Sequence, residues 1–345
     1  MKSNQSAVTL SGAPGSPYTR KMLAVLRYRR IPYRYLVNNH LKSGLPPAKP
    51  ALLPTFYFPC EDGTMKAFTD STPLIRTLET LFNDRQLLPP SPVMGMLDSL
   101  LEDYFDEWLT KPMFHYRWAF DSDVDRASRI VPLPMNIQVN DDMLSTVARA
   151  FGQRQVSRLH VVGSNPATAE LIEGSYLRLL NILEKHFSGH AFLMGLRPGA
   201  SDFALYGQLS QLALFDPTPM AITCAQAPRV VAWTQLTEDL SGLEPKDTDW
   251  IDDQTELASA LKALLSELGR TYVPVMLANQ AAVLKGEQEV ICHVDAQEWR
   301  QLTFPYQAKC LSWLRRDFDQ LSSNDQNHFL RLIHGTGCEP LFAKT

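Results

Sequence analysis

Ala13-Pro14-Gly15-Ser16-Pro17-Tyr18-Thr19-Arg20 joins a short β-prone run, residues 7–10, to a segment whose apolar residues recur at helical spacing. Ser16 followed by Pro17 is typical of a helix start, because a Ser hydroxyl accepts a hydrogen bond from an unpaired amide and Pro has no amide hydrogen. The other unpaired amides and the positive end of the helix dipole favour an anion there. The sequence therefore predicts that Ser16 begins a helix and that its hydroxyl can donate a hydrogen bond to an anion such as a thiolate.

Strand and helix patterns continue through residues 1–90 in the order β-α-β and then β-β-α. Apolar spacing predicts a first helix over about 17–29 and a second helix that begins at Asp70-Ser71. The strands expected after the first helix are residues 33–37, 55–58 and 65–68. This is the thioredoxin-like order, so we expect an α/β thioredoxin-like N-terminal domain.

The Ser16 stretch resembles the opening of the cytosolic glutathione transferases of the serine/cysteine type, in which a strand leads into a Ser-Pro-aromatic or Cys-Pro-aromatic helix start. The resemblance implies that Ser16 is the catalytic residue, which donates a hydrogen bond to the sulfur of glutathione and lowers the thiol pKa. Related thiol-disulfide enzymes carry Cys-Pro-Tyr-Cys here, and this chain has Ser16 and Thr19 in place of the two cysteines. We therefore expect no thiolate exchange chemistry at this turn.

Two further motifs support the resemblance. Leu53-Pro54 stands where the family has Val-Pro or Leu-Pro with a cis peptide bond, which implies that the Leu53 backbone pairs with the cysteinyl part of glutathione. Asp70-Ser71 stands where the family has Glu-Ser or Asp-Ser. There the Ser hydroxyl and helix amides hold the γ-glutamyl carboxylate, and the acid meets the ammonium group. Each pattern also has a purely structural interpretation, as a strand-entry proline and as a helix cap.

Helical spacing dominates residues 95–245, which the resemblance identifies as an all-helical substrate domain. Its clearest pattern, residues 192–205, resembles the loop and Ser/Thr-x-x-Asp capping box that start a buried helix of the family. Gly199 replaces the capping Ser/Thr, so only Asp202 of the reciprocal pair remains. Residues 228–233 resemble the later Pro-to-Trp helix.

Aromatic residues around the start of this second domain have two possible explanations. They could line an acceptor pocket between the domains, or they could form an ordinary core, which is the more common role of an aromatic stripe at helical spacing. The pocket interpretation places Tyr18, Tyr104, Trp108 and His115 around the acceptor substrate.

Residues 246–345 have no counterpart in ordinary members of the family. Their composition is globular, and the strand patterns within 289–302 indicate a β-hairpin. Apolar residues are spread over short elements, and no flexible linker separates them from the preceding helices. We therefore expect a small mixed C-terminal extension that packs on the helical domain.

Composition limits the class of protein. A chain of 345 residues with 45% hydrophobic residues and a net charge of −4 indicates a soluble globular protein of two or more domains, with neither a nucleic-acid nor a membrane partner. No run is long enough for a transmembrane helix and the N-terminus lacks the apolar region of a signal peptide, so a cytoplasmic location is expected. The five cysteines are widely separated and expected to be reduced. Ser188-Gly189 between His186 and His190 indicates a helix end, so no metal site is expected.

The resemblance implies a glutathione transferase, with glutathione as co-substrate, a small electrophile as acceptor and a homodimer as the working form. The alternative is a non-enzymatic binding or assembly module with the same fold, in which the extension mediates interactions. A serine hydrolase is disfavoured because Ser16 does not lie in a G-x-S-x-G sequence.

Overall fold

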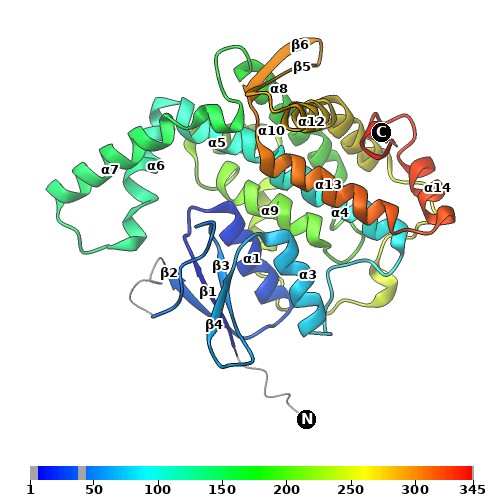
Figure 1. Cartoon of the computed structure of the whole chain (residues 1–345), viewed down its shortest axis with the longest axis horizontal. Coiled ribbons are helices and arrows are strands. Elements are labelled where there is room, and N and C mark those ends of the chain that lie inside the picture. The colour runs from blue at the N-terminus through cyan, green and yellow to red at the C-terminus, as the bar shows by residue number, and fades with distance from the viewer. Residues whose placement is uncertain (1–6, 38–43, 344–345) are drawn as a thin grey trace.

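The computed structural model describes residues 7–37 and 44–343. A four-stranded sheet with two helices forms the N-terminal part, and helices form most of the remainder (Figure 1). The N-terminal elements are β1 (Val8–Gly12), α1 (Pro17–Tyr28), β2 (Tyr33–Val37), β3 (Thr55–Pro59), β4 (Met65–Phe68) and α3 (Ser71–Leu81). This confirms the thioredoxin-like order predicted from the sequence.

The register of the sheet brings the three sequence motifs to one end of the domain. The strand order is β2-β1-β3-β4, with β1 parallel to β2 and β3 antiparallel to both of its neighbours. Ser11 near the end of β1 pairs with Thr55 at the start of β3, and Phe56 pairs with Phe68 at the end of β4. The segments that follow β1, precede β3 and follow β4 therefore lie at the same end of the strands.

The helical part surrounds one fully buried helix, α9. Its elements are α4 (Pro92–Glu107), α5 (Thr110–Ala119), α6 (Asp121–Ile130), α7 (Asp141–Val156), α8 (Ala169–His186), α9 (Ala200–Leu212), α10 (Pro217–Gln226) and α11 (Pro228–Thr237). Every residue of α9 is buried, and the helix packs against both α1 and α4. Gly207 permits the contact with α1, because a Cβ atom there would lie 2.7 Å from the Pro17 carbonyl oxygen. Helices α6 and α7 form a hairpin that projects from the rest (Figure 1).

Two acids cap the start of α9. The Gly199 amide donates to the Asp202 carboxylate at 3.0 Å, as expected for the remaining half of the capping box. The amides of Ala200 and Ser201 donate to Asp98 of α4 at 3.1 and 3.0 Å. Asp98 thus supplies the cap that Gly199 lacks, and a Cβ atom on Gly199 would lie 2.4 Å from an Asp98 oxygen.

The described residues after 245 form three α-helices, a β-hairpin and two short 3-10 helices, Asp247–Asp249 and Glu339–Phe342. The α-helices and strands are α12 (Ser259–Lys285), β5 (Glu289–Val294), β6 (Gln297–Leu302), α13 (Pro305–Asp319) and α14 (Ser323–Leu332). Helix α12 packs on α8, whereas α13 and α14 pack on α4 (Figure 1). The apolar core is continuous from the sheet through the helical part into these elements.

Specific contacts join this extension to the helical part. The Trp299 ring lies against the Trp108 ring with centroids 5.4 Å apart, and the Tyr272 hydroxyl donates to Asp103. Arg178 donates two hydrogen bonds to Glu267, at 2.8 and 2.9 Å. Within the described residues, no helix has the length and apolar character needed to cross a membrane.

Candidate functional site

Ser16 lies at the N-cap of α1, between the sheet edge and the helical part. Its backbone is extended, with φ −93° and ψ 121°, and its Oγ accepts a hydrogen bond from the Thr19 amide at 3.2 Å. Pro17 occupies the first helical position. Because Oγ accepts this bond, its own hydrogen can still be donated to another acceptor. The half-buried Ser16 hydroxyl is therefore placed as a donor at the positive end of α1.

Leu53-Pro54 enters β3 at the same edge of the sheet. The peptide bond between the two residues is cis, as the resemblance implies. The first ladder pair between β1 and β3 is Ser11 with Thr55, so the Leu53 backbone lies outside this ladder. Pro54 is buried and Leu53 is half-buried. The Leu53 main chain therefore lies at the end of a strand pair, where a peptide ligand could extend the ladder.

Asp70 and Ser71 form the start of α3. Asp70 has φ 83° and ψ 114°, a region that a residue with a side chain adopts only under constraint. Its Oδ2 accepts a hydrogen bond from the Tyr306 hydroxyl of α13 at 2.8 Å. Burial raises the pKa of Asp70, and the hydrogen bond from Tyr306 and the charge of Lys21 oppose that rise.

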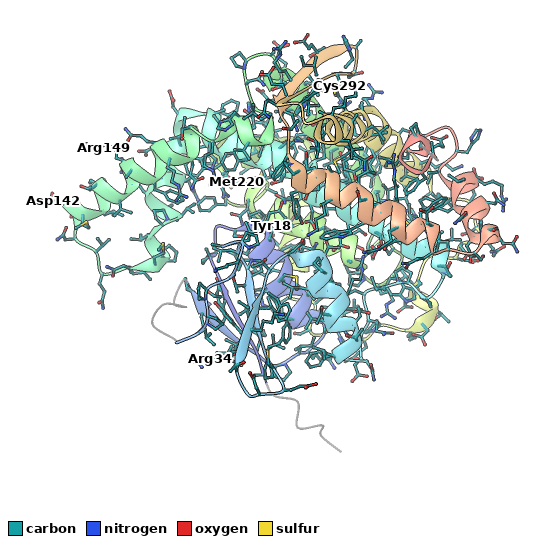
Figure 2. All side chains as sticks on the ribbon, in the orientation of Figure 1. Tyr18, Arg34, Asp142, Arg149, Met220 and Cys292 are labelled. Carbon is teal, nitrogen blue, oxygen red and sulfur yellow. The ribbon has the colours of Figure 1, made fainter. Side chains whose placement is uncertain are left out.

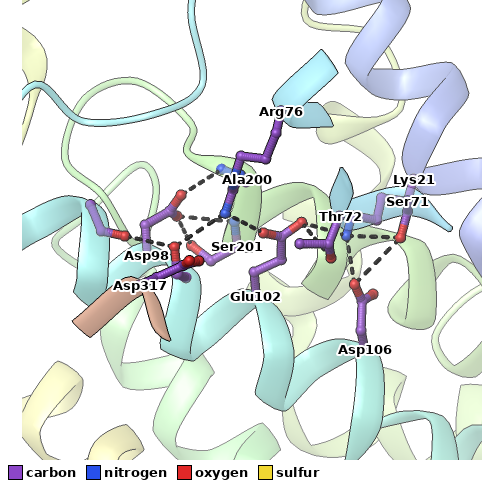
Figure 3. Close-up of polar contacts among 12 residues, drawn as sticks. Lys21, Ser71, Thr72, Arg76, Asp98, Glu102, Asp106, Ala200, Ser201 and Asp317 are labelled. Atoms are coloured by element: carbon purple, nitrogen blue, oxygen red, sulfur yellow. Dashed lines mark hydrogen bonds and ion pairs between the residues drawn. The ribbon is translucent and has the colours of Figure 1, made fainter. Parts of the chain in front are cut away.

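A buried lysine ties α1, α3 and α4 together (Figure 3). Lys21 Nζ donates to Glu102 at 2.8 Å, to Asp106 at 2.6 Å and to Ser71 Oγ at 3.2 Å. Burial disfavours the Lys21 ammonium, but the two carboxylates outweigh it and raise the Lys21 pKa. Arg76 of α3 also pairs with Glu102, at 3.0 Å. This network fixes the start of α3 relative to α1.

Tyr18 lies between the N-terminal and helical parts (Figure 2). Its hydroxyl donates to the main-chain oxygen of Asp106 in α4 at 2.8 Å, and burial raises its pKa well above the ordinary value. Lys21, three residues later, binds the side chain of the same Asp106. Tyr18 therefore helps to hold the two parts of the protein together.

The other three residues expected around the acceptor belong to the core. Trp108 donates to Ser175 Oγ at 3.3 Å, and the Tyr104 ring packs edge-on against Tyr272. The two ring nitrogens of His115 contact Ser164 and Glu173, and burial lowers its pKa. All three side chains are at most 4% exposed. Their packing accounts for them without a ligand, so an acceptor pocket has to be sought elsewhere.

A cavity of about 340 Å³ lies beside the Ser16 turn, although Ser16 itself is not among the residues that line it. Pro14 and Gly15 of the turn line it together with apolar residues that follow α9, such as Phe215, and that lie at or after the end of α6, such as Val131. Helix α9 itself contributes Tyr206, Ser210 and Gln211. Arg20 and Glu238, which form an ion pair at 3.2 Å, add the charged part of the lining. A larger cavity, about 790 Å³, lies between α6 and α7, and the residues that line it include none of the three motifs.

Sequence patterns alone did not indicate Lys21, Tyr306 or this cavity as parts of the site. The sequence shows only that Lys21 interrupts the apolar spacing of the first helix. Its partners could not be predicted, because they lie on two other helices. The cavity is assembled from segments far apart in the chain. Among residues 7–37 and 44–343, no cluster of three His, Cys, Asp or Glu side chains could hold a metal ion.

The family model of the glutathione S-transferase N-terminal domain matches residues 10–86. This range contains Ser16, Leu53-Pro54 and Asp70-Ser71, and it extends from β1 through α3. Residues 10–86 therefore match the N-terminal domain of glutathione S-transferases, and in the structure this α/β thioredoxin-like part is followed by a helical part.

Several solved structures are similar to this chain at low identity. A glutathione S-transferase from Rhodospirillum rubrum F11 is 16% identical with a TM-score of 0.42, and the alignment covers 71% of this chain and 96% of that one. A glutathione transferase family member from Pseudomonas fluorescens Pf-5, with two glutathione bound, is 15% identical with a TM-score of 0.41, covering 66% and 87%. FzlA from C. crescentus is 14% identical with a TM-score of 0.41, covering 66% and 86%. None of the curated proteins matches the chain.

Proposed function

We propose that the protein is a glutathione transferase that binds glutathione along the sheet edge and transfers it to a small electrophile. The observation that carries this proposal is the convergence of Ser16, Leu53-Pro54 and Asp70-Ser71 at one end of the sheet, set by the strand register. All three positions hold residue types that suit the corresponding parts of glutathione.

The proposed chemistry begins with loss of the thiol proton to solvent. The Ser16 hydroxyl donates to the resulting thiolate, and the positive end of α1 favours the same charge, so the thiol pKa falls toward neutral. The thiolate then attacks an electrophilic carbon and forms a carbon–sulfur bond. Either a leaving group departs with its electron pair, or a double bond takes up the pair and then a proton. The contribution of the protein is to favour the anion and to orient it.

The other end of glutathione would bind at the start of α3. The Ser71 hydroxyl and the first amides of α3 suit the γ-glutamyl carboxylate, and the Asp70 carboxylate suits the ammonium group. The Leu53 backbone, which lies beyond the β1–β3 ladder, suits the cysteinyl main chain. In the proposed binding mode, the sulfur of glutathione would lie toward Ser16.

We propose the cavity beside Pro14-Gly15 as the acceptor site. Its volume of about 340 Å³ suits a small molecule, and its apolar lining suits a hydrophobic one. The Arg20–Glu238 pair offers a cationic guanidinium and an acceptor oxygen to a polar substituent of the electrophile. This cavity replaces the acceptor pocket that the aromatic pattern suggested.

Calorimetric titration with glutathione tests the proposal. Wild-type protein is expected to bind glutathione, and Ser71→Ala is expected to weaken binding about tenfold, because the γ-glutamyl carboxylate loses a hydroxyl donor. Ser323→Ala serves as the matched control, because Ser323 is exposed and, like Ser71, is the first residue of its helix. A wild-type protein that shows no binding would contradict the proposed function.

The alternative is a binding or assembly module without turnover. It gains support from the contacts of Asp70 and Ser71, whose side chains already have protein partners in Tyr306 and Lys21. The two functions differ in one result: the module binds glutathione but does not conjugate it to model electrophiles such as an activated aryl halide. Conjugation above the rate of free glutathione would exclude the module.

We further propose that the protein works in the cytoplasm as a homodimer, which the family resemblance implies. All five cysteines are free thiols. This supports a cytoplasmic location, because a reducing compartment keeps cysteines in the thiol form. Light scattering on the purified protein is expected to give twice the mass of one chain, and a monomer mass at all concentrations would contradict the dimer.

A further inference from the structure

The C-terminal extension contacts the proposed glutathione site at Asp70. Tyr306, in the first turn of α13, donates its hydroxyl hydrogen to Asp70 Oδ2 at 2.8 Å. The two residues are 236 positions apart in the chain. The family model ends at residue 86, so this contact comes from a part of the protein that the match does not cover.

The chain segment that carries Tyr306 is anchored on both sides. On the N-terminal side, the fully buried Asn279 of α12 donates to the Phe304 carbonyl at 2.9 Å and accepts from the Phe304 amide at 2.8 Å. On the C-terminal side, the buried Gln307 donates to the Glu107 main-chain oxygen at 3.2 Å. Two elements, α12 and α4, therefore fix the start of α13 and with it the position of the Tyr306 hydroxyl.

Asp70 is constrained as well. Its φ of 83° is uncommon for a residue with a side chain, and such constraint persists only where surrounding contacts hold it. The titratable groups that face its carboxylate are Lys21 of α1, Asp106 of α4, and Tyr306, Lys309 and Cys310 of α13. Of these groups, Tyr306 donates a hydrogen bond to the Asp70 carboxylate.

We propose that Tyr306 is a positioning residue of the glutathione site, whose hydroxyl keeps the Asp70 carboxylate oriented and ionised for the ammonium group of the γ-glutamyl end. The inference rests on the proposed function and deepens it. The C-terminal extension is then part of the ligand site, and recognition of the ligand depends on residues 246–345 as well as on the thioredoxin-like domain.

A carboxylate can serve both partners at once. It has about four acceptor positions on its two oxygens, so a hydrogen bond from Tyr306 leaves room for an ammonium group. Burial raises the pKa of Asp70, and the Tyr306 hydrogen bond is the largest of the contributions that lower it. Removal of the hydroxyl would therefore raise the pKa of Asp70 and shift its protonation toward the pH range in which glutathione binds.

The test compares glutathione binding by wild type and Tyr306→Phe between pH 5 and 8. We expect the variant to bind about tenfold more weakly near neutral pH, and we expect the acid limb of its affinity profile to move to higher pH. Deaminated glutathione, which lacks the ammonium group, should bind the two proteins equally. Tyr272→Phe is the matched control, because it removes another hydroxyl of the extension that donates to a carboxylate, that of Asp103 in α4, which is not a residue of the three motifs.

The outcomes separate this inference from the proposed function. If wild type does not bind glutathione, the proposed function fails and the inference fails with it. If wild type binds but Tyr306→Phe binds equally well, or more tightly, only the inference fails, and tighter binding would mean that the hydroxyl competes with the ligand. Carbon NMR of the Asp70 carboxyl in the ligand-free proteins gives a second readout. An unchanged Asp70 pKa in Tyr306→Phe would overturn the positioning role.

Discussion

Ser16 shows how one hydroxyl can serve both the fold and the proposed chemistry. As an acceptor it satisfies the Thr19 amide in the first turn of α1, and as a donor it can bind a thiolate at the same point. A structural cap needs only the first of these roles. The two roles can therefore be separated by measuring the thiol pKa of bound glutathione, because a serine that only caps the helix would not change this pKa.

Ser16→Ala should raise the thiol pKa of bound glutathione toward its value in solution, because the thiolate loses a hydrogen-bond donor. Each unit of that rise lowers the thiolate fraction, and the conjugation rate, about tenfold when the thiol pKa lies above the assay pH. Thiolate absorbance against pH measures the shift directly. Ser16→Cys is expected to form a mixed disulfide when glutathione disulfide is added, because a cysteine there would have a lowered pKa and its thiolate can attack the disulfide and release one glutathione thiolate.

The matched control for Ser16→Ala is Ser91→Ala. Ser91 also caps a helix, α4, with Pro92 at the first helical position and its Oγ accepting from Met94 at 3.4 Å, and its hydroxyl in addition donates to Asp253. Both alanine variants should lose about 1 kcal/mol of stability through the lost cap. Only the Ser16 variant should alter the bound thiol, and a thiol absorbance curve identical to wild type would show that Ser16 is only a cap.

For single residues, the sequence predicted those features that depend on a few neighbouring positions in the chain. Ser16-Pro17 and Asp70-Ser71 are helix starts that short-range patterns predict, and both lie at helix starts in the structure. Tyr306 could not be predicted, because its partner is 236 residues away and no pattern links the two. The aromatic residues Tyr104 and Trp108 were ambiguous for another reason: helical spacing shows that one face is apolar but does not show what covers it.

Among the elements, α4 carries the largest share of buried charge. Asp98, Glu102, Asp106 and Glu107 are all buried on it. Lys21 and Arg76 pair with part of this set, whereas Asp98 caps α9. The helix therefore connects α1, α3, α9 and α13 through polar contacts as well as apolar ones. The sequence predicted the helix and its apolar spacing, but these acids acquire partners only through tertiary packing.

The acids of α4 predict that stability falls as pH rises. Burial and the neighbouring acids raise the pKa of Glu107 to about 8 and that of Asp103 to about 7. The folded state therefore binds more protons than the unfolded state between about pH 4.5 and 8, so its stability decreases through this window as pH rises. Burial lowers the pKa of Lys111 to about 8. Its titration therefore changes the stability only above this pH window.

Glu107→Gln removes the largest of these pH-dependent contributions. We expect the variant to lose less stability than wild type between pH 5 and 8, by on the order of a few kcal/mol. Thermal unfolding at each pH measures the difference. Glu170→Gln, on the exposed face of α8, should leave the wild-type slope unchanged. Parallel melting curves for Glu107→Gln and wild type would show that Glu107 is ionised in the folded protein.

In the whole molecule, one hydrophobic core continues across the boundaries that the sequence predicts between the three parts of the chain. The thioredoxin-like part, the helical part and the extension all contribute to it. Sequence reasoning identified the order of the parts, because each part has its own pattern of periodicity or motif. It could not say how α13 and α14 pack on α4, because that arrangement depends on the shapes of surfaces from distant segments.

The last prediction concerns this shared core: removal of residues 246–345 should destabilise the remaining protein severely. Truncation would uncover the side chains on α4 and α8 that the extension covers, including Tyr104 and Trp108, which pack against Tyr272 and Trp299. Loss of a large aromatic residue from a core costs about 3–5 kcal/mol, and the extension supplies several. The truncated chain should therefore aggregate or melt far below wild type, as calorimetry and light scattering would show.

A chain cut within the exposed segment 254–256 is the control, since it keeps the extension but breaks its covalent link. The two pieces should stay associated through the contacts of α12 and α13, and the cut protein should melt close to wild type, because packing and not the linkage provides the stability. A truncated protein that stays soluble, melts at the wild-type temperature and binds glutathione with wild-type affinity would contradict the prediction. It would make the extension a separable module, and it would favour the non-enzymatic alternative over a transferase whose site the extension completes.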